Sequence, residues 1–225
     1  MPRQPFKTVR PNAHYYINQN CMADRPAMAA LVARCLTLWS QIDVGMSLIL
    51  AALLDTRSDA AVAVYLSLSN ARAQRDALAS AAQISLLHEM LALFNAVMNI
   101  HKSSSGERND LAHGIFGIVS DADDELIWCP SVKFAAWMTR ANQKAWNLEF
   151  DPDPHALLRD VLFIYKKSDL EQIFERFSFV FDVVSRLHMA IAPMPTAATD
   201  FGRNWLLSQP QIQAELARKD HNNTP

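Results

Sequence analysis

The sequence is poor in glycine, with 5 glycines among 225 residues. An average protein contains about 7% glycine, so this composition argues against collagen, glycine-rich repeats and glycine-loop phosphate-binding sites. Cysteine is also scarce, and the spacing of Cys21, Cys35 and Cys129 matches no zinc or redox motif. Three scattered cysteines are typical of a protein core in a reducing compartment. We therefore expect no bound metal or cofactor and a cytoplasmic location.

Long apolar runs and a strong excess of charge of either sign are also missing. The longest apolar run, residues 44–54, is about half of a membrane span and is interrupted by Gly45 and Ser47. The N-terminal residues are basic, but no apolar segment like that of a secretory signal follows them. With 21 basic and 23 acidic residues, the chain is not a general ligand for polyanions. We expect a protein outside the membrane whose anion-binding site, if it has one, is local.

The composition, 50% hydrophobic and rich in alanine and leucine, is sufficient for a helical core. From Leu31 to Ala52, apolar residues recur at alternating steps of four and three, which predicts a central helix over about 25–54. Similar signals predict helices over about 58–83 and 85–102. Ser168 and Glu171 form a capping box that predicts a long helix ending near residue 191.

Two charged residues interrupt these apolar patterns. Asp43 is the single charge in one apolar stripe of the first helix, and Arg75 replaces an apolar residue in the second. One interpretation is a buried ion pair that joins the two helices. The other is that Asp43 and Arg75 help to position the candidate site described below.

The pattern changes after Gly114. Residues 115–129 predict a β-hairpin with an acidic turn, and a last strand is expected near 161–166. The segment between them fits either strands or a helix, and the sequence DPDP at 151–154 predicts a loop. We expect an extended N-terminal arm over 1–22, a helical domain over 23–192 with a β-rich insertion at about 115–166, and a tail over 193–225 with short helices around Pro210.

One segment, ERNDLAHG at 107–114, combines residues suited to phosphodiester chemistry. We expect it on a short helix of its own, after a polar break at 103–107, and we expect Gly114 to end this helix. There, Asn109 and His113 would share a face, and Arg108 could reach alongside them. A guanidinium binds phosphate oxygens, an imidazole moves protons near neutral pH, and an amide can orient the imidazole or the ribose. No set of metal ligands accompanies these three residues.

The same residues also fit an ordinary helix surface. The spacing R-x-x-x-x-H arises often by chance, and the neighbouring carboxylates of Glu107 and Asp110 could simply pair with Arg108. Asp110 could instead help to position Arg108 or His113. His101, close to the segment, is expected at the surface near a helix end.

The stretch ERNDLAHGIFG at 107–117 resembles the signature of the HEPN family, the all-helical domain of many prokaryotic ribonuclease toxins and defence proteins. That family carries R-x-x-x-x-H, very often with Asn directly after the Arg, as at Asn109. Some branches continue with Ala-His-Gly and an aromatic residue, as at 112–116. The organisation over about 25–192 is also similar, with two long helices before the motif, a β-rich insertion after it and a closing helix.

The resemblance implies a mainly α fold, a HEPN-like helical bundle with a small β-hairpin insertion after the R-x-x-x-x-H helix. It implies a homodimer whose two motifs share a cleft and a metal-independent endoribonuclease. Arg108 and His113 would be the catalytic pair, with Asn109 in support, leaving 2′,3′-cyclic phosphate and 5′-hydroxyl ends on the RNA. An antitoxin protein would be a further partner, but Ile115 stands where one antitoxin-regulated subgroup has a tyrosine.

Two other functions stay open at this point. A catalytically silent HEPN-like module would bind RNA, a nucleotide or a protein, and the net charge of −2 favours it slightly over an enzyme. A generic helical interaction protein would carry the motif by accident. The presence of Arg108, Asn109 and His113 together favours the enzyme.

Overall fold

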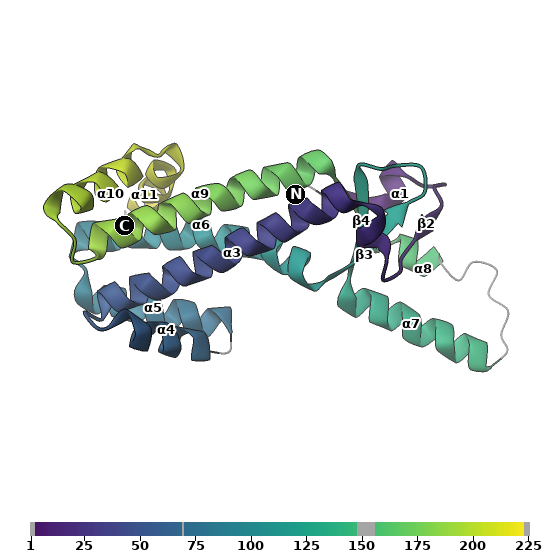
Figure 1. Ribbon diagram of the computed structural model, residues 1–225, viewed down its shortest axis with the longest axis horizontal. Helices are drawn as coiled ribbons and strands as arrows, with labels where there is room; N and C mark the ends of the chain where they lie inside the picture. Colours follow the sequence, from purple (N-terminus) through teal and green to yellow (C-terminus); the bar gives the residue numbers. More distant parts are fainter. Residues whose placement is uncertain (1–2, 69, 148–155, 223–225) are drawn as a thin grey trace. The chain divides into compact units, whose positions relative to one another are not determined.

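The computed structural model describes residues 3–68, 70–147 and 156–222. The protein is mainly helical with one small antiparallel sheet (Figure 1). The chain divides into two compact units, each built from two separate stretches. The first unit comprises Met1–Leu36 and Gly106–Glu175, and the second comprises Thr37–Ser105 and Arg176–Pro225.

The first unit is organised around the five-stranded sheet. Its strands are β1 (Gln4–Pro5), β2 (Tyr15–Tyr16), β3 (Gly114–Val119), β4 (Glu125–Pro130) and β5 (Phe163–Lys166), arranged in the order β1-β5-β4-β3-β2. All neighbouring strands are antiparallel. The hairpin and the last strand predicted from the sequence are therefore confirmed as β3, β4 and β5.

The N-terminal segment is part of this sheet, so the prediction of an extended arm over 1–22 was wrong. β1 pairs with β5, β2 pairs with β3, and the short helices α1 (Phe6–Val9) and α2 (Cys21–Asp24) connect them to the rest. Phe6 is fully buried in the sheet core. Two-residue strands are too short to show an alternating pattern, and only their pairing with distant strands stabilises them.

The segment after β4, for which the sequence allowed either strands or a helix, contains the helix α7 (Ser131–Trp146) and the short helix α8 (Ala156–Arg159). Phe134 and Trp137 of α7 pack against the apolar core of the sheet. No residue of α7 is fully buried, so the helix lies on the surface of the first unit. The predicted loop at 151–154 lies outside the described residues.

The helices of the second unit follow the apolar patterns with corrected boundaries. They are α3 (Pro26–Leu53), α4 (Ser58–Ser67), α5 (Ala71–Ser85), α6 (His88–His113), α9 (Lys167–Ile191), α10 (Thr196–Ser208) and α11 (Pro210–Asn222), of which α3, α6 and α9 contribute a part to each unit. The ends of α3 and α9 and the two helices around Pro210 were predicted. Within the second unit, α3 approaches α9 closely, since a Cβ at Gly45 would lie 2.8 Å from Val184 Cγ1.

Three local predictions were wrong. Residues 58–83 form two helices, because Asn70 caps a new one by accepting a hydrogen bond from the Ala73 N–H at 2.8 Å. The polar stretch at 103–107 does not break α6. The hydroxyls of Ser103 and Ser105 each donate to the carbonyl three residues earlier, at 2.8 Å, and so stay compatible with the helix.

The third wrong prediction concerns the start of the last long helix. α9 begins at Lys167, which leaves Ser168 inside its first turn rather than at the capping position. The Asp169 carboxylate accepts a hydrogen bond from the Lys166 N–H at 2.8 Å. Asp169 therefore satisfies one of the free backbone donors at this helix end, and the Asp124 carbonyl accepts from another, the Lys167 N–H, at 2.9 Å.

The helix α3 is long and apolar enough to cross a membrane when judged by length and composition alone. The same properties are found in core helices of soluble proteins. Both predicted apolar stripes of α3 are at least half-buried throughout, and Ile42, Met46 and Ile49 have no exposed surface. The stripes thus form part of the protein interior.

Candidate functional site

The predicted motif occupies the last turns of α6, within the first compact unit. The helix ends at His113, and the next residue, Gly114, begins β3. Asn109 and His113 are exposed and lie one helical turn apart on the same face, whereas Arg108 is half-buried. The structure therefore presents the amide and the imidazole together at the surface, with the guanidinium beside them.

Arg108 and Asn109 contact each other directly. The Arg108 Nη1 donates a hydrogen bond to Asn109 Oδ1 at 3.3 Å. Within the described part of the chain, Arg108 forms no ion pair with a carboxylate, in contrast to the pairing with Glu107 or Asp110 that the sequence left open. The guanidinium thus keeps donors for an anionic ligand, and the amide Nδ2 of Asn109 is a further donor next to it.

Asp110 has a different partner. Its carboxylate forms an ion pair with Arg3 at 2.5 Å, and its backbone oxygen accepts a hydrogen bond from the Trp128 indole Nε1 at 2.7 Å. The Arg3 guanidinium also lies over two aromatic rings, 4.0 Å from the centre of Trp128 and 4.9 Å from that of Phe163. Asp110 therefore anchors the end of α6 to the sheet and so holds its neighbours in place.

Gly114 is required by the same packing. A Cβ added at Gly114 would lie 1.7 Å from the Trp128 indole nitrogen, a distance that no side chain could tolerate. The sequence predicted Gly114 as a helix terminator. The structure adds a second reason for glycine, since Trp128 must approach the backbone this closely to reach the Asp110 carbonyl.

Tyr165 of β5 lies beside this cluster and is 1% exposed. Its burial raises the pKa of the hydroxyl to about 12, opposed by Arg3 and assisted by the negative charges of Asp110 and Glu107. The hydroxyl therefore stays protonated at neutral pH. Arg3, Trp128 and Tyr165 support the site from positions far away in sequence, and no local pattern could have pointed to them.

Asp43 and Arg75 belong to the second compact unit, whereas the motif belongs to the first. Both are half-buried and act on the buried hydroxyl of Tyr65 in α4. Burial raises the pKa of Tyr65, the charge of Asp43 raises it further, and Arg75 lowers it. The two charged residues are thus brought into the electrostatic environment of one buried tyrosine.

His101 is buried, so the expectation of a surface residue was wrong. It is 5% exposed, and its ring lies 5.1 Å from that of Trp39. Within the described residues, neither ring nitrogen has a hydrogen-bond partner. Burial, together with the positive charge of Arg75, lowers the pKa of His101 to about 4. This imidazole is neutral at physiological pH and belongs to the helical core of the second unit.

Other candidate sites are weaker. Among the described residues, no three His, Cys, Asp or Glu side chains lie together in a way that could hold a metal ion. The cysteines Cys21, Cys35 and Cys129 are all buried, as expected, and burial raises the pKa of the Cys129 thiol to about 11. A thiol with this pKa is a poor nucleophile at neutral pH.

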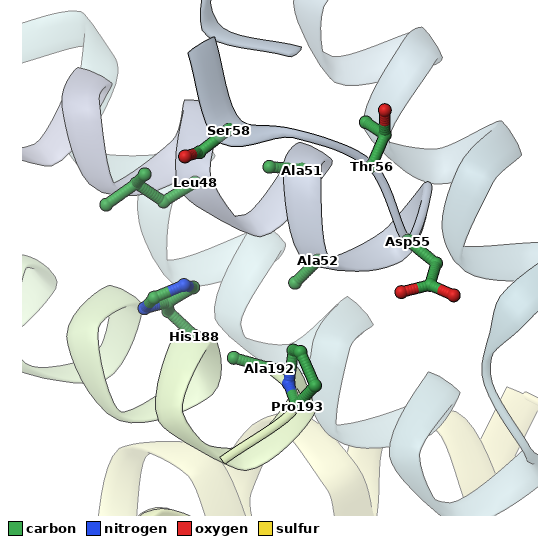
Figure 2. A pocket seen from close by; sticks show the side chains of 9 residues that line it. All are labelled: Leu48, Ala51, Ala52, Asp55, Thr56, Ser58, His188, Ala192 and Pro193. Carbon is green, nitrogen blue, oxygen red and sulfur yellow. The ribbon is translucent and has the colours of Figure 1, made fainter. Parts of the chain in front are cut away.

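The second unit contains an open pocket of about 220 Å³ between the end of α3 and the end of α9. Figure 2 shows that short side chains form much of its wall, with His188 on one side and Asp55 on the other. Burial lowers the pKa of His188. The pocket offers few groups for chemistry and contains none of the motif residues.

Comparison with known proteins adds no further constraint on the function. No protein family, curated protein or solved structure gives a significant match to this chain. The functional conclusion must therefore come from the geometry of the chain itself.

Proposed function

We propose that this protein is a metal-independent endoribonuclease of the HEPN type that works in the cytoplasm. The observation that supports the proposal is the exposed face at the end of α6, where Asn109 and His113 lie one turn apart. Beside them, Arg108 donates a hydrogen bond to Asn109 at 3.3 Å. The contacts of Asp110 and Gly114 with Trp128 hold this helix end rigidly. A rigid scaffold of this kind suits a catalytic site.

The proposed reaction uses the ribose 2′-hydroxyl of the RNA as the nucleophile. His113 accepts the proton of this hydroxyl as its oxygen attacks the adjacent phosphorus. Arg108 stabilises the extra negative charge on the phosphate oxygens, and Asn109 orients the ribose or the guanidinium. The bond from phosphorus to the 5′-oxygen breaks, and the leaving 5′-oxygen takes up a proton from solvent. His113 then releases the proton that it accepted to solvent, which restores the neutral imidazole. The products are a 2′,3′-cyclic phosphate end and a 5′-hydroxyl end.

We further propose that the active form is a homodimer. One helix end supplies one guanidinium and one imidazole, which contact a phosphodiester from one side. A two-fold axis would place a second set opposite the first in a shared groove. Light scattering at micromolar concentration is expected to give the mass of a dimer, and a monomer that cleaves RNA at full rate would contradict this part of the proposal.

The decisive experiment is incubation of RNA with the purified protein in EDTA, followed by analysis of the end groups. We expect cyclic phosphate and 5′-hydroxyl ends, and cleavage about 10²–10⁴-fold slower with His113→Ala. Arg108→Lys should also be inactive, because a point charge does not reproduce the planar two-pronged grip of a guanidinium. The matched controls are His88→Ala, an exposed histidine at the other end of α6, and Arg72→Lys, an exposed arginine of α5.

A catalytically silent HEPN-like module that binds RNA, a nucleotide or a protein is the second candidate. The net charge of −2 favours it, because an overall negative chain binds nucleic acid only through local contacts. This alternative predicts that diverse RNAs stay intact in the same experiment while Arg108→Lys weakens RNA binding. Cleavage that stops in EDTA would contradict the metal-independent mechanism but not the nuclease activity.

A further inference from the structure

The surface helix α7 carries a row of positive charge. Its sequence SVKFAAWMTRANQKAW contains three cationic residues and no acidic one. Lys133, Arg140 and Lys144 are all exposed and are separated by seven and four residues. On an α-helix this spacing places the three within about 40° of one another around the axis, along about 16 Å of its length. The row contrasts with a chain whose net charge is −2.

The packing of α7 fixes the direction in which this row points. Phe134 and Trp137 lie against the core of the sheet, with their rings 5.5 Å apart. The three cations flank this packed face and remain at the surface. Phe134 and Trp137 are thus already packed on protein, whereas Val132, Met138 and Trp146 of the same helix are exposed.

The register of the sheet brings the beginning of α7 next to the candidate site. In the ladder between β3 and β4, Gly114 is the partner of Pro130. His113 directly precedes Gly114, and Ser131, the first residue of α7, directly follows Pro130. Paired residues in an antiparallel ladder have Cα atoms about 5 Å apart, so the first residue of α7 lies close to His113, and Lys133 follows two residues later.

We infer that the row of Lys133, Arg140 and Lys144 binds the sugar-phosphate backbone of RNA and directs one strand to His113. The inference rests on the proposed nuclease function for its choice of polyanion. A row of about 16 Å is long enough to contact several successive phosphates. Lysine and arginine contacts to phosphate carry no base specificity, so the row sets the position of the RNA rather than its sequence.

The test measures RNA binding by fluorescence anisotropy in the His113→Ala background, which leaves the RNA uncut. The probe is a labelled single-stranded RNA of mixed sequence, titrated between 50 and 200 mM salt. The variant Lys133→Ala/Arg140→Ala/Lys144→Ala should bind at least about ten-fold more weakly at the lowest salt. Each lost phosphate contact lowers the slope of log affinity against log salt by about 0.7, so the slope should fall by about 2.

Two further variants separate the row from general effects of charge and folding. Arg57→Ala/Arg72→Ala/Arg218→Ala removes three exposed cations from the second unit and should change the affinity much less. Lys133→Arg/Arg140→Lys/Lys144→Arg keeps the charges and should bind like the parent. The inference is wrong if Lys133→Ala/Arg140→Ala/Lys144→Ala binds RNA as tightly as Arg57→Ala/Arg72→Ala/Arg218→Ala does, with an unchanged slope of log affinity against log salt.

The outcomes also distinguish this inference from the proposed function. Suppose that the wild-type protein cuts no RNA but loses RNA affinity when the three cations of α7 are removed. This result would overturn the nuclease proposal and support the inference that the row binds RNA. If the variant without the three cations of α7 cleaves RNA with an unchanged KM and an unchanged RNA affinity, the nuclease proposal is supported. The inference that the row binds RNA is then wrong. The inference is also wrong if removing the three cations of α7 weakens binding to phosphatidylserine vesicles and leaves RNA affinity unchanged.

Discussion

The two histidines in the second half of α6 have opposite environments. His101 is 5% exposed, packs against Trp39 and has a pKa lowered to about 4. His113, about three turns later, is exposed at the helix end, one turn from Asn109. Both residues have the same intrinsic chemistry, and the helix that carries them is continuous. Their surroundings make the first a neutral core residue and leave the second exposed at the surface.

The largest expected effect is the loss of RNA cleavage on changing the exposed histidine. His113→Ala should reduce the cleavage rate by about 10²–10⁴-fold, the usual contribution of a general acid or base. Its melting temperature should stay close to that of the wild type, because the exposed ring contributes little packing. Cleavage rates of His113→Ala and His88→Ala, measured beside their melting curves, test this. If His113→Ala and His88→Ala lose cleavage activity to the same extent, His113 has no special role compared with another exposed histidine of α6.

The second prediction concerns the buried histidine. Unfolded His101 has its ordinary pKa near 6.5 and takes up a proton below that pH, whereas the folded protein resists protonation until about pH 4. The unfolded state therefore binds more protons in this window, and stability falls as pH decreases from about 6.5 to 4, by roughly 3 kcal/mol in total. No loss from this group is expected above pH 6.5.

Urea unfolding at several pH values between 4 and 7 measures this effect. His101→Leu removes the titrating group and should show a flatter dependence of the unfolding free energy on pH than the wild type. The other titrating groups are common to both proteins, so their contributions cancel in the difference. Parallel pH profiles for the two proteins would show that His101 is not held neutral by the fold.

The third prediction tests the anchor that holds the exposed end of α6. Gly114→Ala should destabilise the protein by about 1–3 kcal/mol, because the new Cβ displaces the Trp128 indole from its contact with Asp110. The change should also reduce cleavage, since the helix end loses its fixed position. Chemical denaturation measures the first effect and an RNA cleavage assay the second. A variant with wild-type stability would mean that Trp128 can shift without cost.

The smallest expected effect is an increase in stability. A Cβ at Gly106 has no neighbouring atom within 4 Å, and the residue lies inside α6. Gly106→Ala should therefore stabilise the chain by about 0.5–1 kcal/mol, through the higher helix propensity of alanine. Denaturation measures the change, and light scattering follows the oligomeric state. Destabilisation together with loss of the dimer would show that a second copy of the chain packs closely on this face.

Much of the secondary structure could be predicted from the sequence. The apolar stripes of α3 are a strong periodic signal, and the residues that form them are buried or half-buried in the structure. The hairpin of β3 and β4 and the end of α6 at His113 were also predicted, because alternation and a helix-ending glycine are local features. The serine-rich part of α6 was misread, since serine hydroxyls can bond within the helix as well as outside it.

For the candidate site, the sequence by itself determined that Arg108, Asn109 and His113 occupy one short stretch of helix and that two of them share a face. Local spacing is enough for that conclusion, because helix geometry is regular. Only the tertiary structure decided that Asp110 is bound to Arg3, that Trp128 lies against Gly114, and that α7 starts beside His113. These contacts join residues far apart in the chain, and strand pairing and close packing, which no local pattern encodes, bring them together.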